Sequence, residues 1–498
     1  MRLRSILSES FGRAARENVS MNRLISLALM SGFCLMLLAC TTQEAPSGLV
    51  VSNVTVVSAE RDAPMEHAYV RILDGRIAEV SERRLRGEQE INGKGRYLIP
   101  GLIDTHVHLA VPPGFPSAMT AEQAAAHHEV VAAALAQDPR SYLFFGFTTL
   151  VDLIGTAERT KQWNALEIRP DAYFCGGAAI MDDHIQLVLA PFFSYEQESR
   201  IDPAEHTPET AVARIASDGA SCVKTFYQEG VPGLPTSSLE MARALVGAAH
   251  EHGLPVFIHA NRKGDQAFSV AAGVDVIVHG MWRSMNEEAA LDNEAREILA
   301  AIARDNIGYQ PTTQVIVGLQ EMLHDDYLAR PELADAYSTA LIDWYASKEG
   351  GWYADQIRKW NTGLDAEAQF RETLNRASEV TGILDKADAH LLFGTDTPSD
   401  MIYTNPPGLN GRLEMDNWIA AGISEKKLFR AMTIDNARAI GLEGKIGTVE
   451  VGKTANMLLL GGNPLESVKA YDTIETVFLH GRPIARETLS ARAVKEGK

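Results

Sequence analysis

The feature that most constrains the fold is a repeated alternation of short apolar segments and helical segments over residues 101–442. In the helical segments, apolar residues recur at three-and-four spacing, as one buried helix face requires. The expected strands span residues 102–108, 148–153, 172–177, 222–227, 255–260, 274–280, 308–313 and 390–397. Eight β/α units with right-handed crossovers close into a barrel. The sequence therefore predicts an α/β fold built on a (β/α)8 TIM barrel.

The two ends of the barrel region are flanked by a different pattern. Residues 48–100 and 443–485 contain short alternating segments with turn residues such as Asp74-Gly75 between them, which is typical of antiparallel strands. We expect both ends to pair into one small β-sandwich. Residues 314–386 separate the seventh and eighth strands and are expected to form a helical insertion that acts as a lid over the barrel mouth.

The N-terminal residues 1–40 carry an apolar segment. From Met21, a short basic start with Arg23 precedes about fifteen apolar or small residues that end at Cys40. The pattern resembles a bacterial lipoprotein signal, which implies cleavage before Cys40, a diacylglycerol on its sulfur and a tether over residues 41–47. The protein would then be lipid-anchored in the bacterial envelope and face the periplasm. The alternative is an ordinary signal anchor, although the segment is shorter than the ~20 residues of a membrane span. Residues before Met21 are interpreted as an upstream extension from a misassigned start.

Charge and cysteine content narrow the possible partners. Lys and Arg number 46 against 65 Asp and Glu, and the net charge of −19 is spread along the chain. A phosphate backbone would be repelled, so these numbers argue against a nucleic-acid partner. Four cysteines are too few for a disulfide framework, and Cys175 and Cys222 are expected to serve as small packing residues.

Chemistry-bearing side chains gather at the carboxyl ends of the predicted strands. His106 and His108 are two residues apart on the first strand, so both rings leave its interior face. Later strands add Lys224, His259, His279 and Asp396. Burying so many polar groups without partners would cost several kcal/mol each, so their convergence predicts a site for divalent metal.

The ordered set HxH, Lys, His, His, Asp, with PGLIDTHVHL at its start and GTD near its end, resembles the amidohydrolase superfamily. Within that superfamily the text is most similar to the Xaa-Pro dipeptidase and imidazolonepropionase-like branch. The resemblance covers nearly the whole chain after the N-terminal segment. It departs from the family text at Thr454 and Asn456, which puts a local turn of the sandwich in doubt and leaves the metal site untouched.

The resemblance implies two divalent ions, with zinc as the expected metal and iron, manganese or cobalt as alternatives. The side chains would divide between a more buried ion, a more exposed ion and a bridge between them: His106, His108 and Asp396 for the first, His259 and His279 for the second, and carbamylated Lys224 as the bridge. A hydroxide bridging the metals would attack the substrate. Asp396 would accept its proton and hand that proton to the leaving nitrogen.

Three further residues are weaker candidates for substrate contact. Tyr227 could donate a hydrogen bond to the developing oxyanion, and Arg262 could pair with a substrate carboxylate. His184, in the loop after the third strand, could also touch substrate. Each has a structural alternative, which is rim packing for Tyr227, a salt bridge for Arg262 and a surface loop for His184. Glu414 is interpreted as a solvated or lid-contacting residue.

The sequence therefore predicts a metal-dependent hydrolase of amide-type C–N bonds, either a dipeptidase or an N-acyl amino acid hydrolase, acting on a small-molecule substrate. A mononuclear deaminase is an alternative, but the text His259-Ala-Asn-Arg lacks the Glu that such enzymes place there. An esterase, lactonase or phosphotriesterase remains open because the same metals support it. A catalytically inactive scaffold is disfavoured because every ligand is present. Substrate identity and oligomeric state are not predicted.

Overall fold

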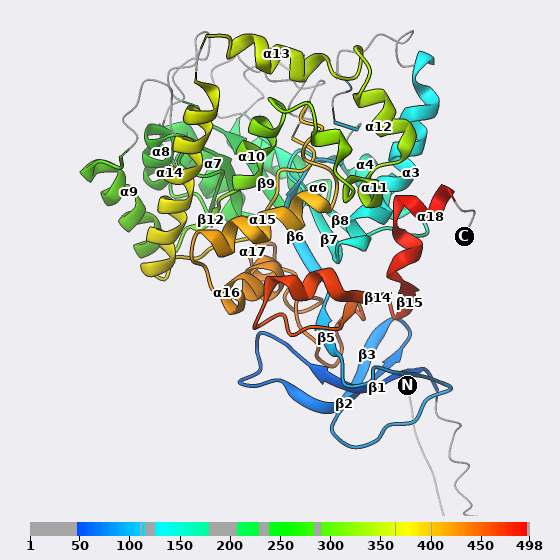
Figure 1. Ribbon diagram of the computed structural model, residues 1–498. Coiled ribbons are helices and arrows are strands. Elements are labelled where there is room, and N and C mark those ends of the chain that lie inside the picture. The colour runs from blue at the N-terminus through cyan, green and yellow to red at the C-terminus, as the bar shows by residue number, and fades with distance from the viewer. Residues whose placement is uncertain are drawn as a thin grey trace, which may run out of the picture. The chain divides into compact units, whose positions relative to one another are not determined.

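In the computed structural model of the protein, a curled parallel sheet positions the predicted site (Figure 1). Its seven strands follow one another in chain order, from β6 at one edge to β12 at the other. Their bounds are Leu102–Val107 (β6), Phe147–Asp152 (β7), Asp171–Gly177 (β8), Cys222–Phe226 (β9), Val256–His259 (β10), Val276–Val278 (β11) and Gly308–Gln310 (β12). Most of these residues are buried, because helices cover one face of the sheet and the other face curls inward on itself.

The predicted eighth strand is an irregular segment that lies between the two edges of this sheet. On one side, the Tyr309 N–H donates to His390 O at 2.9 Å. On the other side, the His108 N–H donates to Thr397 O at 2.8 Å. The α/β class is confirmed, and the curled sheet with this bridging segment is consistent with the predicted TIM barrel.

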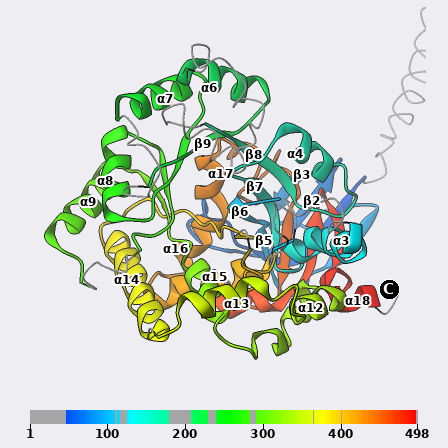
Figure 2. The ribbon, with the colours of Figure 1, turned by 90° about the horizontal axis from the view of Figure 1, so that it is seen from above.

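Helices surround the curled sheet when it is viewed from above (Figure 2). They include α3 (His128–Phe144), α4 (Ala157–Asn164), α6 (Pro208–Ser217), α7 (Leu239–Glu251), α8 (Lys263–Ala272), α9 (Asn293–Arg304), α14 (Ala366–Lys386) and α15 (Leu409–Ala420). Two more helices, α16 (Glu425–Arg430) and α17 (Asn436–Ala439), follow α15, and α17 contacts β6. Side-chain caps fix several starts. Thr156 accepts the Arg159 N–H at 3.1 Å to begin α4, for example.

Short helices occupy the region where the insertion was expected. They are α10 (Thr313–Glu321), α11 (Leu333–Ala336), α12 (Thr339–Tyr345) and α13 (Trp352–Trp360). Trp344 stacks on Phe115, with 3.9 Å between ring centroids, and the Tyr345 hydroxyl donates to Pro113 O. Through these contacts α12 packs against the segment that follows β6. Figure 2 shows α12 and α13 at the perimeter of the ring of helices, and a lid role for them stays a prediction.

The two ends of the chain form one mixed sheet, in the order β15-β14-β13-β5-β1-β2-β3 with β4 beside β1. Its strands are Leu49–Val56 (β1), Met65–Leu73 (β2), Arg76–Ser81 (β3), Gln89–Asn92 (β4), Tyr97–Pro100 (β5), Met457–Leu460 (β13), Ile474–Leu479 (β14) and Arg482–Ala485 (β15), and α18 (Ala491–Lys495) follows. The pairing of early and late strands is confirmed and is consistent with the expected sandwich. Asn456 donates to Asp171 Oδ2 at 2.9 Å, so a position that departs from the family text joins this sheet to β8.

The structure describes residues 47–109, 112–113, 115, 125–178, 207–228, 239–282, 290–363, 365–399 and 401–495. The signal segment, the tether up to Pro46, the lipidation site Cys40 and the loop residue His184 lie outside these ranges. Their expected roles stay predictions. Across the described ranges, no helix has both the length and the apolar character needed to cross a membrane.

Cys175 of β8 and Cys222 of β9 form a disulfide, with 4.4 Å between their Cα atoms. The expectation that these residues only pack as small side chains was wrong. They are 47 residues apart in sequence, but the crossover between the strands places them directly opposite each other in the parallel register. Both are fully buried. Lys224 follows Cys222 by two residues and therefore leaves the same face of β9.

Candidate metal centre

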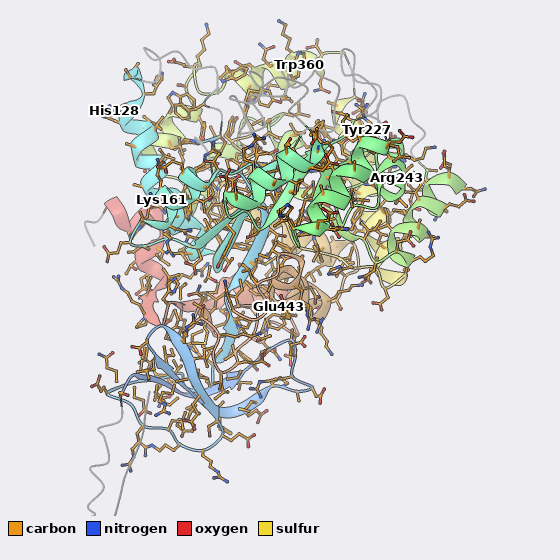
Figure 3. All side chains as sticks on the ribbon, turned by 180° about the vertical axis from the view of Figure 1, so that it is seen from behind. His128, Lys161, Tyr227, Arg243, Trp360 and Glu443 are labelled. Carbon is orange, nitrogen blue, oxygen red and sulfur yellow. A yellow bond between two sulfur atoms is a disulfide. The ribbon has the colours of Figure 1, made fainter. Side chains whose placement is uncertain are left out.

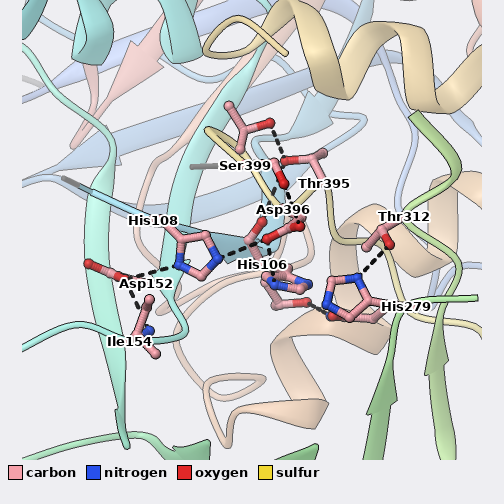
Figure 4. A network of polar contacts seen from close by, with 12 residues as sticks. His106, His108, Asp152, Ile154, His279, Thr312, Thr395, Asp396 and Ser399 are labelled. Atoms are coloured by element: carbon pink, nitrogen blue, oxygen red, sulfur yellow. Dashed lines mark hydrogen bonds and ion pairs between the residues drawn. The ribbon is translucent and has the colours of Figure 1, made fainter. Parts of the chain in front are cut away.

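Three of the predicted ligands meet where β6 and the irregular eighth segment end (Figure 4). His108 Nε2 lies 2.8 Å and His106 Nε2 lies 3.1 Å from Asp396 Oδ1. The Asp396 N–H also donates to His106 O at 2.7 Å, so the backbone holds the two segments in register. One ligand atom from each of the three side chains lies within 4.8 Å of the others, which is close enough to share one metal ion.

The remaining predicted ligands border this group. The His279 ring centroid lies 5.1 Å from that of His106 and 4.3 Å from that of His259. Phe226, which sequence reasoning missed, stacks on the His259 ring at 3.9 Å. Lys224 is only 5 % exposed, and its charge helps to lower the pKa values of His106, His259 and His279. The structure thus brings the six predicted ligands to the same end of the curled sheet.

The rings of this centre are suited to binding a cation because most of them are neutral. Burial lowers the pKa of His106 to about 4. Burial also holds the pKa values of His259 and His279 well below the ordinary range for histidine. A neutral imidazole presents a nitrogen lone pair, and that lone pair is what a divalent metal needs.

His108 differs because it lies between two carboxylates. Its Nδ1 is 3.8 Å from Asp152 Oδ1 at the end of β7, while its Nε2 contacts Asp396. Burial alone would lower the pKa of His108, but Asp152 and Asp396 outweigh it and raise the pKa to about 9. Asp152 was not singled out from the sequence. A buried acid at a strand end, opposite the HxH pair, is the pattern that could have indicated it.

The two remaining titratable groups both have lowered pKa values, which favours the neutral form of Lys224 and the charged form of Asp396. Burial lowers the pKa of Lys224 to about 7, so the neutral amine is well populated at neutral pH. Burial would raise the pKa of Asp396, but His106, His108 and His279 together hold it well below the ordinary range. Asp396 is therefore a carboxylate. It also accepts the Ser399 hydroxyl at Oδ2, at 3.0 Å.

The donor set fits a divalent metal. Neutral imidazoles and one carboxylate are the ligand types that zinc, iron, manganese and cobalt accept. His279 Nδ1 is engaged by Thr312 Oγ1 at 3.0 Å, which leaves its Nε2 for an ion (Figure 4). His279 and Asp396 both have positive φ angles, of 79° and 58°, a conformation that is uncommon for non-glycine residues.

Two of the weaker candidates lie next to this centre. Tyr227 directly follows β9, and its ring stacks on Phe268 of α8 with centroids 3.8 Å apart. Figure 3 places Tyr227 toward the same end of the molecule as Trp360, and Glu443 toward the terminal sheet. Arg262 is the residue before α8, and its backbone N–H donates to Asp265 Oδ2 at 3.1 Å. Both side chains are half-buried.

The interpretation of Glu414 as solvated was wrong, whereas its contact with Gln314, the first residue of the expected insertion, agrees with the alternative of a contact to that insertion. The Glu414 side chain is 0 % exposed and accepts the N–H groups of Thr313 and Gln314, at 3.1 and 2.6 Å. Trp418 Nε1 also donates to it at 3.0 Å. A glutamate within a helix usually faces solvent, but this one satisfies the amino end of a neighbouring helix, a role that local sequence does not indicate.

Comparisons with known proteins agree with this fold. The profile of the amidohydrolase family matches residues 97–484. A structure described as a Xaa-Pro dipeptidase with bound methionine superimposes with a TM-score of 0.58 at 18% identity, covering 88% of this chain and 99% of that one. The ochratoxinase of A. niger superimposes with a TM-score of 0.60 at 19% identity, covering 89% and 96%. At these identities the likeness concerns the fold.

The curated relatives match only a short segment. A 5-methylthioadenosine/S-adenosylhomocysteine deaminase of Halalkalibacterium halodurans is 37% identical over 70 residues, which is 13% of this chain. The match spans 16% of that relative. A short segment of this kind does not carry a whole protein's activity.

Proposed function

Because the chain belongs to the amidohydrolase family, we propose that it is a metal-dependent hydrolase of amide-type C–N bonds, either a dipeptidase or an N-acyl amino acid hydrolase. The observation that carries the proposal is the convergence of His106 and His108 on Asp396 at the strand ends. Structures of similar fold are described as a Xaa-Pro dipeptidase and as a prolidase complexed with N-methylphosphonate-L-proline, which supports a dipeptide-like substrate.

The proposed centre holds two divalent ions, with zinc as the expected metal. His106, His108 and Asp396 would hold one ion, and His259 and His279 the other. The Lys224 amine would react with carbon dioxide, forming a carbamate and releasing a proton. Its lowered pKa supports this step, because the neutral amine is the reactive form. A carbamate supplies one negative charge and two oxygens where an ammonium would repel both ions.

Bound divalent ions would supply an activated water molecule and polarise the scissile carbonyl. Asp396, held as a carboxylate, would accept the proton of the attacking water and pass it to the leaving nitrogen. Ser399 donates to Asp396 Oδ2 and limits rotation of the carboxyl group. Asp152, opposite the other ring nitrogen, would hold the ring of His108 in its binding orientation.

Substrate contacts are proposed for three residues. Tyr227 would donate its hydroxyl to the developing oxyanion, and Arg262 would pair with a substrate carboxylate. Their positions after β9 and before α8 support this proposal, because both lie within a few residues of the metal ligands Lys224 and His259. His184 is proposed from the sequence alone.

We propose the periplasmic face of the bacterial envelope as the location, with a lipid anchor at Cys40. The buried disulfide between Cys175 and Cys222 supports this location, because structural disulfides form and persist in oxidising compartments.

The test is a substrate screen carried out together with metal analysis. Purified protein should contain close to two equivalents of divalent metal and hydrolyse a member of a dipeptide and N-acyl amino acid library. His106→Ala should lose metal and activity together, whereas Arg243→Ala, an exposed change on α7, should retain both. One equivalent of metal with ammonia release from a heterocyclic amine would instead identify a deaminase. Activity on esters or lactones alone would overturn the amide assignment.

A further inference from the structure

Thr312 occupies the position before α10 but does not cap that helix. A threonine at an N-cap usually accepts the N–H of the second or third helical residue. Here no such bond forms, and the Thr312 hydroxyl instead lies 3.0 Å from His279 Nδ1. Thr312 is fully buried and has a φ of 45°, so it is held in a conformation that threonine seldom adopts.

Glu414, from α15, takes over the capping of α10. Its carboxylate accepts the N–H groups of Thr313 and Gln314, which are the first two residues of the helix. Gln314 is in the second helical position, which an N-cap hydroxyl would otherwise satisfy. The third donor to this carboxylate is Trp418 Nε1, one turn along α15. Among the described residues, Glu414 is the acidic side chain that meets the start of α10.

The loop before α10 is also hydrogen-bonded to the residue that follows His279. The Gly280 N–H donates to Pro311 O at 2.9 Å. Any shift of the start of α10 would therefore move the Thr312 hydroxyl relative to the imidazole. A hydrogen bond at Nδ1 fixes the rotation of the ring, and when Nδ1–H is the donor, Nε2 is left as the ligand atom.

We propose that Glu414 is a positioning residue of the metal centre. By capping α10, it releases the Thr312 hydroxyl to accept the Nδ1–H of His279 and to aim Nε2 at the more exposed ion. This relay, from Glu414 through Thr312 to His279, rests on the proposed function, since it presumes that His279 binds metal. Glu414 and Thr312 would thus orient a metal ligand without contacting the substrate themselves.

The test measures cobalt binding by metal-free protein in competition with a chelator, so its readout is affinity and not turnover. Thr312→Val removes the hydroxyl at nearly constant shape, and Thr312→Ser restores it. Glu414→Gln keeps the shape but leaves one helix N–H facing an amide NH2. We expect the weaker cobalt site to lose about 10- to 100-fold in affinity in Thr312→Val and Glu414→Gln, and Thr312→Ser to stay near wild type.

The matched control is Thr404→Val. The Thr404 hydroxyl donates to Gly318 O at 2.6 Å, so it is another buried hydroxyl bound to the same helix, but away from its amino end. Thr404→Val should bind cobalt like wild type even if it lowers the melting temperature. An equal loss of cobalt affinity in this control would show that the losses in Thr312→Val and Glu414→Gln come from general destabilisation. That result would overturn the relay.

The double variant separates a relay from two independent effects. If Glu414 acts through Thr312, the variant that carries both Thr312→Val and Glu414→Gln should lose no more affinity than either single variant. Losses that multiply would overturn the relay. Should Glu414→Gln fail to fold, Trp418→Phe replaces it, because that change removes one hydrogen bond to the same carboxylate. Wild-type protein that binds no cobalt would contradict the proposed function itself, whereas normal binding by the variants would contradict only the relay.

Discussion

At the scale of single residues, Asp396 is proposed to have two roles, which are metal binding and proton transfer. Its Oδ1 faces both His106 and His108, as a ligand of a shared ion would. Its low pKa makes it a carboxylate that can accept a proton once water is activated beside it.

Asp396→Asn distinguishes these two roles. An amide oxygen can still coordinate, so the variant should retain most of its metal, but it cannot accept a proton, so kcat should fall by about 10²- to 10⁴-fold. Metal analysis and turnover on the substrate found by screening give the two numbers. Turnover like that of wild type, with both ions bound, would remove the proton-shuttle role.

Lys224→Ala should behave differently from Asp396→Asn. Without the carbamate, two dications would repel each other across the site, so the variant should retain close to one equivalent of metal and lose nearly all activity. Adding a short carboxylic acid should restore part of the second equivalent, because its carboxylate can occupy the same position. Full activity in the absence of added acid would contradict a carbamate bridge.

At the scale of helices and strands, a residue's position could be predicted from the sequence where neighbouring residues determine it. The HxH pair, His259 and His279 were predictable because each lies at the end of a short apolar run. The eighth strand was predicted as regular. In the structure this segment pairs through isolated bridges at Leu391 and Thr397, and Asp396 between them has a positive φ, so it does not form a regular strand.

The roles of other residues could not be predicted because they depend on partners far along the chain. Asp152 acts on a histidine of the neighbouring strand, and Glu414 caps a helix about a hundred residues away. The disulfide between Cys175 and Cys222 depends on strand register in the same way. One sequence contains no periodicity that links such positions.

Helix α3 carries a pH-dependent element of stability. Asp138 is buried in it, and burial raises its pKa to about 8, so its carboxyl group is protonated in the folded state at neutral pH. In the unfolded chain the pKa is near ~3.9. Because the folded-state pKa is the higher one, this stability is fully present below pH ~4 and is lost as the pH rises through about 8.

Asp138→Asn should remove that dependence. The melting temperature of the variant minus that of wild type should therefore increase between pH 5 and pH 8, and calorimetry at several pH values measures it. Asp343→Asn, an exposed change on α12, serves as the control and should show no such trend. A difference for Asp138→Asn that is constant with pH would contradict the assignment.

At the scale of the whole molecule, the proposed anchor at Cys40 would determine where the protein works. Cells labelled with a radioactive fatty acid should incorporate label into the wild-type protein. The Cys40→Ser protein should remain unlabelled and be recovered in the soluble periplasmic fraction. Label retained by the variant would contradict lipidation at this cysteine.

The terminal sheet sets the order in which this chain can finish folding. Strand β5 pairs with β13, and Ile99 lies opposite Leu458. This edge of β5 therefore stays unpaired until Leu458 has been synthesised. Until then β5 presents unpaired backbone groups, which invite association with other chains. Contacts of such long sequence separation form slowly, because a large loop must close before they stabilise anything. A ribosome-stalled or truncated chain that lacks β13 would therefore expose an unpaired, aggregation-prone edge of β5. Quality-control proteases would degrade such a chain before a metal centre could form.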